Sequence, residues 1–367
     1  MRQITLETLT KELADGSRNF DFTDFSKLDL SGMALVNMSF KSADFSHANL
    51  SKCNLQGSTF ERCIFKDTNF DSTDCTNAIM TRADFTKAQL IKTVFDHTDL
   101  RYTIFKTATF SEVKFLNAVL LEANFEGCDI PKCDFSNSDL SSAKLDNAKV
   151  EESGFFGTNL RNASLKKTNF TKANLKGAQL IRTNLKEAIF KEAEILKANL
   201  RNSLISYADF SDAQMTLVNL AKSKIRHTKF ERATIKECNF SDSDLNHSIF
   251  TGAHLIESNF SGSSINDVTL KLEELDCCSF LRTRLDGSDF SSMKLNELVL
   301  DMPETAAEDD ANVDEEQMPP DETGADAGAI FLAEKDTKMK QAQAKAAAER
   351  PISRPVTKED LWPTKKR

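Results

Sequence analysis

Residues 43–52 read ADFSHANLSK, which is two five-residue units, each with a small residue, then Asp or Asn, then a large apolar residue. The same spacing continues in both directions without a gap. Every fifth residue from Phe20 to Leu300 is apolar, which makes 57 consecutive positions. The residue two before each of these centres is Ala, Ser, Thr or Cys from Ala43 to Val268, except at three valines. Since a period of five fits neither a helix nor a strand, it predicts a backbone that turns a corner every fifth residue.

Four such corners return the chain to its starting side, so four units predict one square coil. The large and the small residue of each unit point inward, and stacked coils together bury what no single coil can bury. Phe dominates the aromatic residues, with 27 Phe against 2 Tyr and 1 Trp. Because Phe has no polar tip that needs a partner, this favours a dry interior. Stacking predicts columns made of every fourth unit, such as six rings from Phe25 to Phe125 and an outward amide ladder from Asn159 to Asn259.

Units such as Ala43-Asp44-Phe45 and Ala173-Asn174-Leu175 resemble the pentapeptide-repeat family, whose repeat is written A(D/N)LXX. The resemblance covers most of the chain, from Phe20 to Leu300. It implies an all-β solenoid, a right-handed quadrilateral β-helix of about 14 coils over residues 20–300.

Both ends of this solenoid need protection, because an open β-helix exposes unpaired strand edges. Residues 1–19 are expected to form a short helical cap whose apolar residues are Ile4, Leu6, Leu9 and Leu13, with Gly16 able to end the helix. Near the other end Glu273 falls on an inward position, where an unpaired carboxylate would be costly. We therefore expect a local distortion of the coil over residues 271–278.

The repeat stops after Leu300, and a tail of different composition follows. Residues 301–328 form an acidic linker, and the part up to residue 326 holds 11 Asp or Glu and no Lys or Arg, which predicts disorder. Residues 329–367 contain a helix candidate at 329–349 and end in an aromatic peptide with Leu361 and Trp362. A tether, a helix and an aromatic terminus indicate a docking tail, with an inert solubilising tail as the alternative.

Motifs for catalysis are missing from the sequence, so we expect no enzyme and no cofactor. His227 and His247 share an outward column with Glu187, Tyr207 and Asp267, which could hold a metal in principle, but a solvated column on a flat wall is favoured. Seven of the eight cysteines fall on inward positions, which predicts reduced thiols and a reducing compartment. We expect a cytoplasmic protein without a membrane span, or one delivered elsewhere without a cleaved signal peptide.

Function is less constrained than fold. The favoured hypothesis is a protein-binding scaffold or adaptor whose partner is unknown, with a homodimer left open. Apolar side chains on one outward column suggest a contact stripe, with Leu217 beside it. The residues of this column are Val36, Leu116, Phe156, Leu196 and Ile256.

Two alternatives follow from the family resemblance. Some members resemble DNA in width and charge and engage DNA gyrase, which confers quinolone resistance. Here residues 1–300 hold 40 acids and 37 bases, so the rod lacks the acidity of a DNA mimic, and it is also a poor nucleic-acid binder. Other members are effectors or accessory components of bacterial secretion systems, with a rod and non-repeat ends similar to those of this chain.

Overall fold

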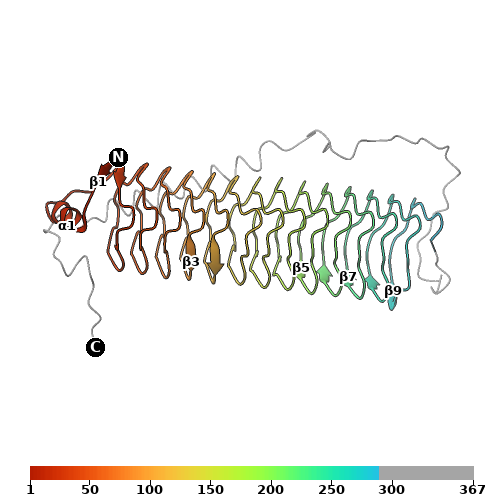
Figure 1. Ribbon diagram of the computed structural model, residues 1–367. Coiled ribbons are helices and arrows are strands. Elements are labelled where there is room, and N and C mark those ends of the chain that lie inside the picture. The colour runs from red at the N-terminus through yellow and green to blue at the C-terminus, as the bar shows by residue number, and fades with distance from the viewer. Residues whose placement is uncertain (289–367) are drawn as a thin grey trace, which may run out of the picture.

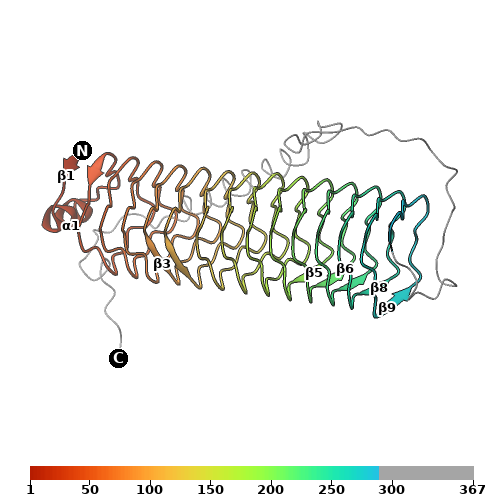
Figure 2. The ribbon, with the colours of Figure 1, turned by 45° about the vertical axis from the view of Figure 1, so that its right-hand side comes forward.

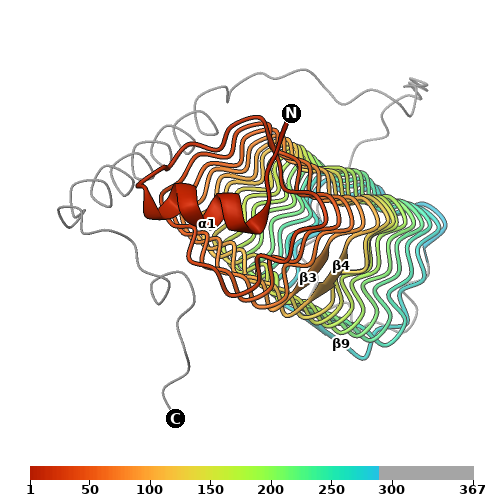
Figure 3. The ribbon, with the colours of Figure 1, turned by 60° about the vertical axis from the view of Figure 1, so that its left-hand side comes forward.

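The structure is a computed structural model, and it describes residues 1–288. These residues form a long rod of stacked coils with helix α1 (Leu6–Ala14) at its N-terminal end (Figure 1). Parallel backbone bridges join each coil to the next, from Asn19 and Ser39 at the start to Ser264 and Arg284 near the end. The predicted solenoid of about 14 turns is therefore confirmed. Viewed from its N-terminal end, the rod shows coils that follow one another with nearly the same outline (Figure 3).

Regular strands are short, because each wall of a coil is only a few residues long. Near the N-terminus β1 (Arg2–Gln3) pairs with β2 (Thr23–Asp24). On one wall β3 (Gln89–Ile91) pairs with β4 (Thr109–Ser111). The next wall carries a five-stranded parallel sheet (Figure 2). In order, its strands are β5 (Glu194–Leu196), β6 (Gln214–Thr216), β7 (Thr234–Lys236), β8 (His254–Ile256) and β9 (Glu274–Asp276).

The corners between walls are tight turns with a left-handed residue. At one corner the N–H of Ala48 donates to the carbonyl of Phe45 at 2.9 Å, which closes a four-residue turn. The third residue of that turn, His47, has a φ of 60°, as type II turns require. The same position has positive φ in every unit from Phe22 to Gly287 except at Leu272. The period of five is thus the distance between successive left-handed turn residues.

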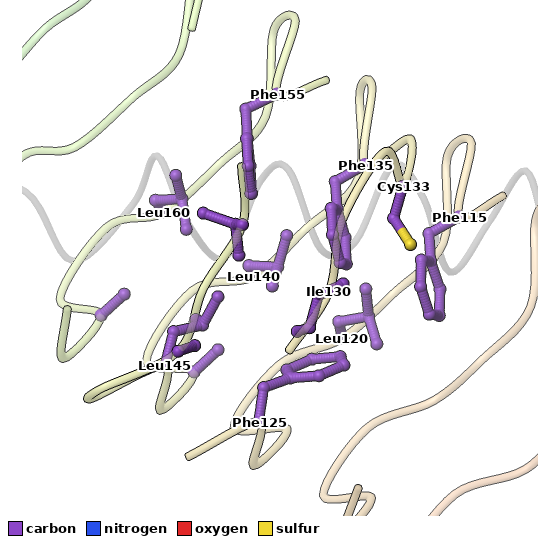
Figure 4. Close-up of a cluster of buried hydrophobic side chains, with 14 of the residues drawn as sticks. Phe115, Leu120, Phe125, Ile130, Cys133, Phe135, Leu140, Leu145, Phe155 and Leu160 are labelled. Carbon is purple, nitrogen blue, oxygen red and sulfur yellow. The ribbon is translucent and has the colours of Figure 1, made fainter. Parts of the chain in front are cut away.

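The core is a set of ring and aliphatic columns along the rod (Figure 4). Centroids of neighbouring rings in the predicted column from Phe25 to Phe125 lie 4.6–5.3 Å apart. A second predicted column, from Phe190 to Phe250, has spacings of 4.5–5.3 Å. Both predictions are confirmed.

Small inward residues fill the space between the columns and satisfy backbone acceptors. The hydroxyl of Thr68 donates to the carbonyl of Phe45 at 2.7 Å, and that of Thr73 donates to Leu50 at 2.7 Å. Alanine has no polar atom to satisfy at this position, whereas Ser or Thr donates to a backbone carbonyl, either one coil away or, as at Thr103 and Ser138, three residues earlier in its own turn. This explains why the inward position accepts these residues although it is fully enclosed.

The predicted amide ladder is wrong in its bonding, although its residues are in register. The side-chain oxygens of Asn199, Asn239 and Asn259 accept the N–H two residues further along at 2.9–3.2 Å. Each amide thereby stabilises its own corner, as Asx turns do, and does not bond to the amide of the next coil.

The cap at the N-terminus is the predicted one. Helix α1 lays Leu9 and Leu13 on the first coil, where both are fully buried, whereas Leu6 at the start of the helix is 37 % exposed and does not join the apolar side. It ends at Gly16, whose φ is 90°, with Ser17 N–H donating to the carbonyl of Glu12 and Gly16 N–H donating to that of Leu13. This is a Schellman motif, which needs glycine at the left-handed residue.

Around Glu273 the coil is distorted, as the sequence predicts. Glu273 is exposed, and the N–H groups of Glu273 and Glu274 both point to the carbonyl of Ala253. Leu272 loses the left-handed conformation found at the other corners. The chain thus turns the Glu273 carboxylate into solvent, and one corner loses its left-handed turn. As a result Leu275 is only half-buried.

Candidate protein-binding surfaces

The apolar stripe lies on one corner of the rod, but its members are not neighbours. Phe156 is 51 % exposed and Leu217 is 42 % exposed, and the other four residues are half-buried. Between the apolar residues the same column carries Asp96, Lys176 and Lys236. The stripe is therefore a row of separate apolar points and not a continuous patch.

Three of these points are evenly spaced. Leu116, Phe156 and Leu196 lie two coils apart, which corresponds to about 10 Å, since adjacent coils are about 4.8 Å apart. The ring of Phe156 stands on a corner with little side-chain bulk. Gly154 and Gly157 lie close to it in the sequence, and Gly177 lies next to Gly157 in the following coil. Val36 and Ile256 lie four and three coils beyond this row, and Leu217 lies beside its far end. The proposed tail contacts Leu361 and Trp362 lie outside the described residues.

The histidine column forms a ring stack. The ring of Tyr207 lies 4.8 Å from that of His227, which lies 4.8 Å from that of His247. His247 Nδ1 is 3.7 Å from Asp267 Oδ2. Within residues 1–288, no three His, Cys, Asp or Glu side chains converge in a way that suits a metal.

The thiols are poor nucleophiles. Burial raises the pKa of Cys53, Cys133 and Cys238 to about 12, and that of Cys128 and Cys278 to about 11. Since only the thiolate attacks, these sulfurs are inert while the coil is folded. None of the eight cysteines, all of which lie within residues 1–288, forms a disulfide, and Cys277 is the exposed one.

One corner of the rod carries a basic surface that the sequence analysis did not identify. Of the ten arginines in residues 20–288, seven lie on a single corner, the one that follows the wall centred on Phe20, Phe40 and Phe60. Six of these form what we call the arginine ridge. Its members are Arg62, Arg82, Arg101, Arg161, Arg182 and Arg201. Writing the sequence with one coil per row would have revealed it, because only one corner collects arginine.

The arginine ridge consists of two triplets separated by two coils. Arg82 lies over the ring of Tyr102, 5.4 Å from its centroid, and Arg101 makes a two-point pair with Asp99 at 2.6 and 2.9 Å. In the two coils between the triplets the same corner carries Leu121 and Glu122, and then Ser141 and Ser142, in place of arginine. The ridge therefore has two basic ends and a less charged middle.

Next to this gap, four outward residues in consecutive coils are buried. Asp99 and Val119 are 2 % exposed, Asp139 is fully buried and Asn159 is 8 % exposed. Every other described residue at this position of the unit, on all four walls, is at least partly exposed. Asp139 Oδ1 accepts from Asn159 Nδ2 at 2.9 Å and from Ser141 N–H at 3.1 Å, and its Oδ2 has no hydrogen-bond partner within the described part of the chain.

Among residues 1–288 no helix has the length and apolar character needed to span a bilayer.

Comparisons with known protein families identify the same kind of sequence repeat along the rod. The family model described as pentapeptide repeat region matches residues 123–200 and 163–240. The model described as pentapeptide repeats (8 copies) matches residues 19–57, 48–86, 63–101 and 233–271. A search of curated protein sequences returned no match.

Similar solved structures include HetL from the cyanobacterium Nostoc sp. strain PCC 7120, a pentapeptide repeat protein involved in heterocyst differentiation regulation. The match is 22 % identical, covers 75 % of this chain and 96 % of HetL, and has a TM-score of 0.24. QnrB1, a plasmid-mediated fluoroquinolone resistance protein, is 20 % identical over 41 % of this chain and 83 % of its own, with a TM-score of 0.28.

Proposed function

Because the chain belongs to the pentapeptide-repeat family, we propose that it is a non-enzymatic protein-binding scaffold, a rigid rod that carries a C-terminal docking tail. The observation that carries this proposal is the unbroken register of the coils. Backbone hydrogen bonds join each coil to the next both in the walls, such as Phe45 N–H to Ile64 O at 2.8 Å, and at the corners, such as His47 N–H to Lys66 O at 2.8 Å. Outward side chains therefore lie in rows of fixed spacing, which suits the recognition of another ordered surface.

The row of Leu116, Phe156 and Leu196 is the proposed contact. Its spacing of about 10 Å is close to the rise of about 10.5 Å over two turns of a helix. An amphipathic helix with apolar residues at every seventh position would place one on each point. Phe156 would be the central anchor, since it is the most exposed of the three and large aromatic residues dominate interface energies.

The test uses the full chain as bait and compares Phe156→Asp with Tyr207→Asp, which changes an equally exposed ring on another corner. The recovered amount of a partner that binds the stripe is expected to fall at least tenfold with Phe156→Asp, because the charge would be buried in the interface. With Tyr207→Asp the recovered amount is expected to stay the same. Trp362→Ala tests the tail in the same way. If all variants recover the same proteins in the same amounts, neither surface binds a partner and the scaffold proposal fails.

The alternatives have less support. A DNA mimic needs an acidic surface, whereas the corner of this rod that carries the arginine ridge is basic. A secretion-system role rests on the general layout of rod and tail. Dimerisation through the stripe and a cytoplasmic location remain predictions.

A further inference from the structure

We propose that one wall of the rod, the wall that follows the arginine ridge, binds an acidic helix of a partner protein. The surface covers four consecutive coils, which we call the basic wall. Its segments are 161–167, 181–187, 201–207 and 221–227. The basic wall shares no residue with the apolar stripe. The inference therefore adds a second surface to the proposed scaffold and can be tested whether or not the stripe binds a partner.

The basic wall carries more positive charge than the other three walls of the same coils. Leaving out Arg182, which has an interaction of its own, the wall and its two corners hold eight bases and one acid. Counted in the same way, the preceding wall holds five bases and no acid, and the two following walls hold eight bases with five acids and six bases with five acids. Residues 1–300 as a whole hold 40 acids and 37 bases. A local excess of this kind favours an anionic partner.

Five of the eight bases form no ion pair with any residue of 1–288. They are Arg161, Lys166, Arg201, Lys222 and Lys224, and all except the half-buried Arg161 are exposed. The other three are held by a neighbouring carboxylate or ring, as Lys167 is by Glu187 at 3.4 Å and Arg226 is by Asp244. The charge of the five is therefore not neutralised within the described part of the chain and is available to carboxylates of another molecule.

Four of these bases stand at the two ends of the basic wall. Arg161 and Lys166 lie on its first coil, and Lys222 and Lys224 lie three coils further on, which is about 14 Å away. Between the ends the outward wall positions carry half-buried, uncharged side chains, which are Ser164, Asn184 and Leu204. Three turns of a helix rise about 16 Å. A helix with carboxylates at both ends of three turns would therefore meet a pair of bases at each end.

The backbone of the basic wall favours a helix over an extended segment as the ligand. The N–H of Leu204 donates to the carbonyl of Thr183 at 3.0 Å, and the N–H of Ile205 donates to the carbonyl of Lys224 at 2.7 Å. Because the coils on either side take up these groups, an extended peptide along the wall would find no strand edge to pair with. A helix satisfies its own backbone and needs only the side chains of the wall.

Acidic coils beyond the basic wall favour a short ligand. On the same wall, segment 121–127 and segment 241–247 each hold two acids and no Lys or Arg. A nucleic-acid strand or an anionic bilayer would extend past the basic wall and meet these carboxylates. Nucleobases would also find little free ring surface, because the rings of Tyr207 and His227 stack at 4.8 Å and Lys186 lies over the ring of Tyr207.

The experiment measures the Kd of the full chain for a fluorescent helical peptide by fluorescence anisotropy. The peptide carries glutamates at positions i, i+4, i+7 and i+11, which place four carboxylates on one face over three turns. An isomer of the same composition spreads the glutamates around the helix. We expect the isomer to bind at least tenfold more weakly, and the binding of the first peptide to be lost in about 0.5 M NaCl, which screens exposed charges.

The double variant Arg201→Glu with Lys224→Glu tests the basic wall directly. Its matched control is Lys149→Glu with Lys229→Glu, which changes the net charge equally at exposed positions of the next wall. Lys229 lies on the same coil as Lys224. We expect the Kd of the peptide to rise at least tenfold with the first variant and to stay within about twofold of the wild type with the control, because close charge pairs dominate such contacts.

Both variants are compared at urea midpoints equal to that of the wild type, and double alanine variants at the same positions replace them if the glutamates shift the midpoint. An equal rise of the Kd in test and control would overturn the proposal, since the peptide would then respond only to net charge. Equal binding of the isomer or no binding of either peptide would overturn it as well. So would tighter binding of oligothymidylate or of phosphatidylserine vesicles that is lost in the test variant, because the wall would then be a nucleic-acid or membrane surface.

Discussion

At the scale of single residues, each position of the unit has its own physical constraint. The inward small position is enclosed by four large side chains of its coil and by the coils on either side. Ala48, for example, is 2 % exposed. This limit on volume is visible in the sequence, because it restricts the residue type at a fixed spacing. The left-handed corner residue is less visible, since most units carry a side chain such as Lys, Glu, Asn, Arg or His there, although eight of the nine glycines in residues 20–288 fall on this position.

Ala48→Phe is expected to destabilise the rod by at least about 1–3 kcal/mol, the usual range for overpacking, because no cavity can accept the ring. The measurement is the midpoint of urea unfolding. Ser46→Phe, two residues earlier and outward, is the control and should unfold near the wild-type midpoint. Equal midpoints for Ala48→Phe and wild type would mean that the inward register is wrong.

The buried thiols predict a loss of stability at alkaline pH. Burial raises the pKa of Cys53 to about 12, whereas an unfolded thiol titrates near 8.5. A group whose folded pKa is raised contributes full stability below its unfolded pKa and loses it as pH rises toward the folded value. The contribution of each such thiol therefore falls by about 1.4 kcal/mol per pH unit above roughly pH 9.

Accordingly the urea midpoint should decrease between pH 8 and pH 9.5, and the decrease should be smaller in a Cys53→Ala variant. A midpoint that stays constant over this interval in the wild-type chain would show that the thiols are not held protonated by the fold.

At the scale of the structural element, the five-residue unit combines a short wall with a strained corner. A non-glycine residue in the left-handed region costs roughly 1 kcal/mol or more, and the fold contains this conformation at nearly every corner. The period of five predicted that a corner exists but not its conformation. The exception at Leu272 follows from Glu273, whose carboxylate had to leave the core, and this distortion was predictable because one charged residue interrupts the inward series.

Two threonines that lie two residues apart allow the corner and the wall to be tested separately. Thr107 has a φ of 57°, whereas Thr109 begins β4, and both are exposed. Thr107→Gly should raise the free energy of unfolding by roughly 0.5–1 kcal/mol, because glycine adopts positive φ without strain. Thr109→Gly should lower it by a similar amount, because glycine weakens a strand. Urea unfolding of both variants checks the sign, and a loss of stability in both would contradict strain at the corner.

At the scale of the whole molecule, the rod turns sequence spacing into distance along an axis. The Phe columns could be predicted because every fourth unit must stack once the coil is square. The surfaces were harder to predict. The apolar column was identified, but its interruption by charged residues weakens it as a single patch. The arginine ridge was missed because its members alternate between two adjacent positions of the unit, so no single column displays it.

The most direct test of this account measures the coil rise by pulsed electron spin resonance in a Cys277→Ser background. Spin labels are placed on one corner column, either at positions 52 and 172 or at positions 52 and 232. These pairs lie six and nine coils apart, so we predict separations of roughly 29 and 43 Å, which differ by about 14 Å. Distances that do not increase in proportion to the number of coils would contradict the stacked rod, and with it the fixed rows of side chains on which the proposed scaffold function depends.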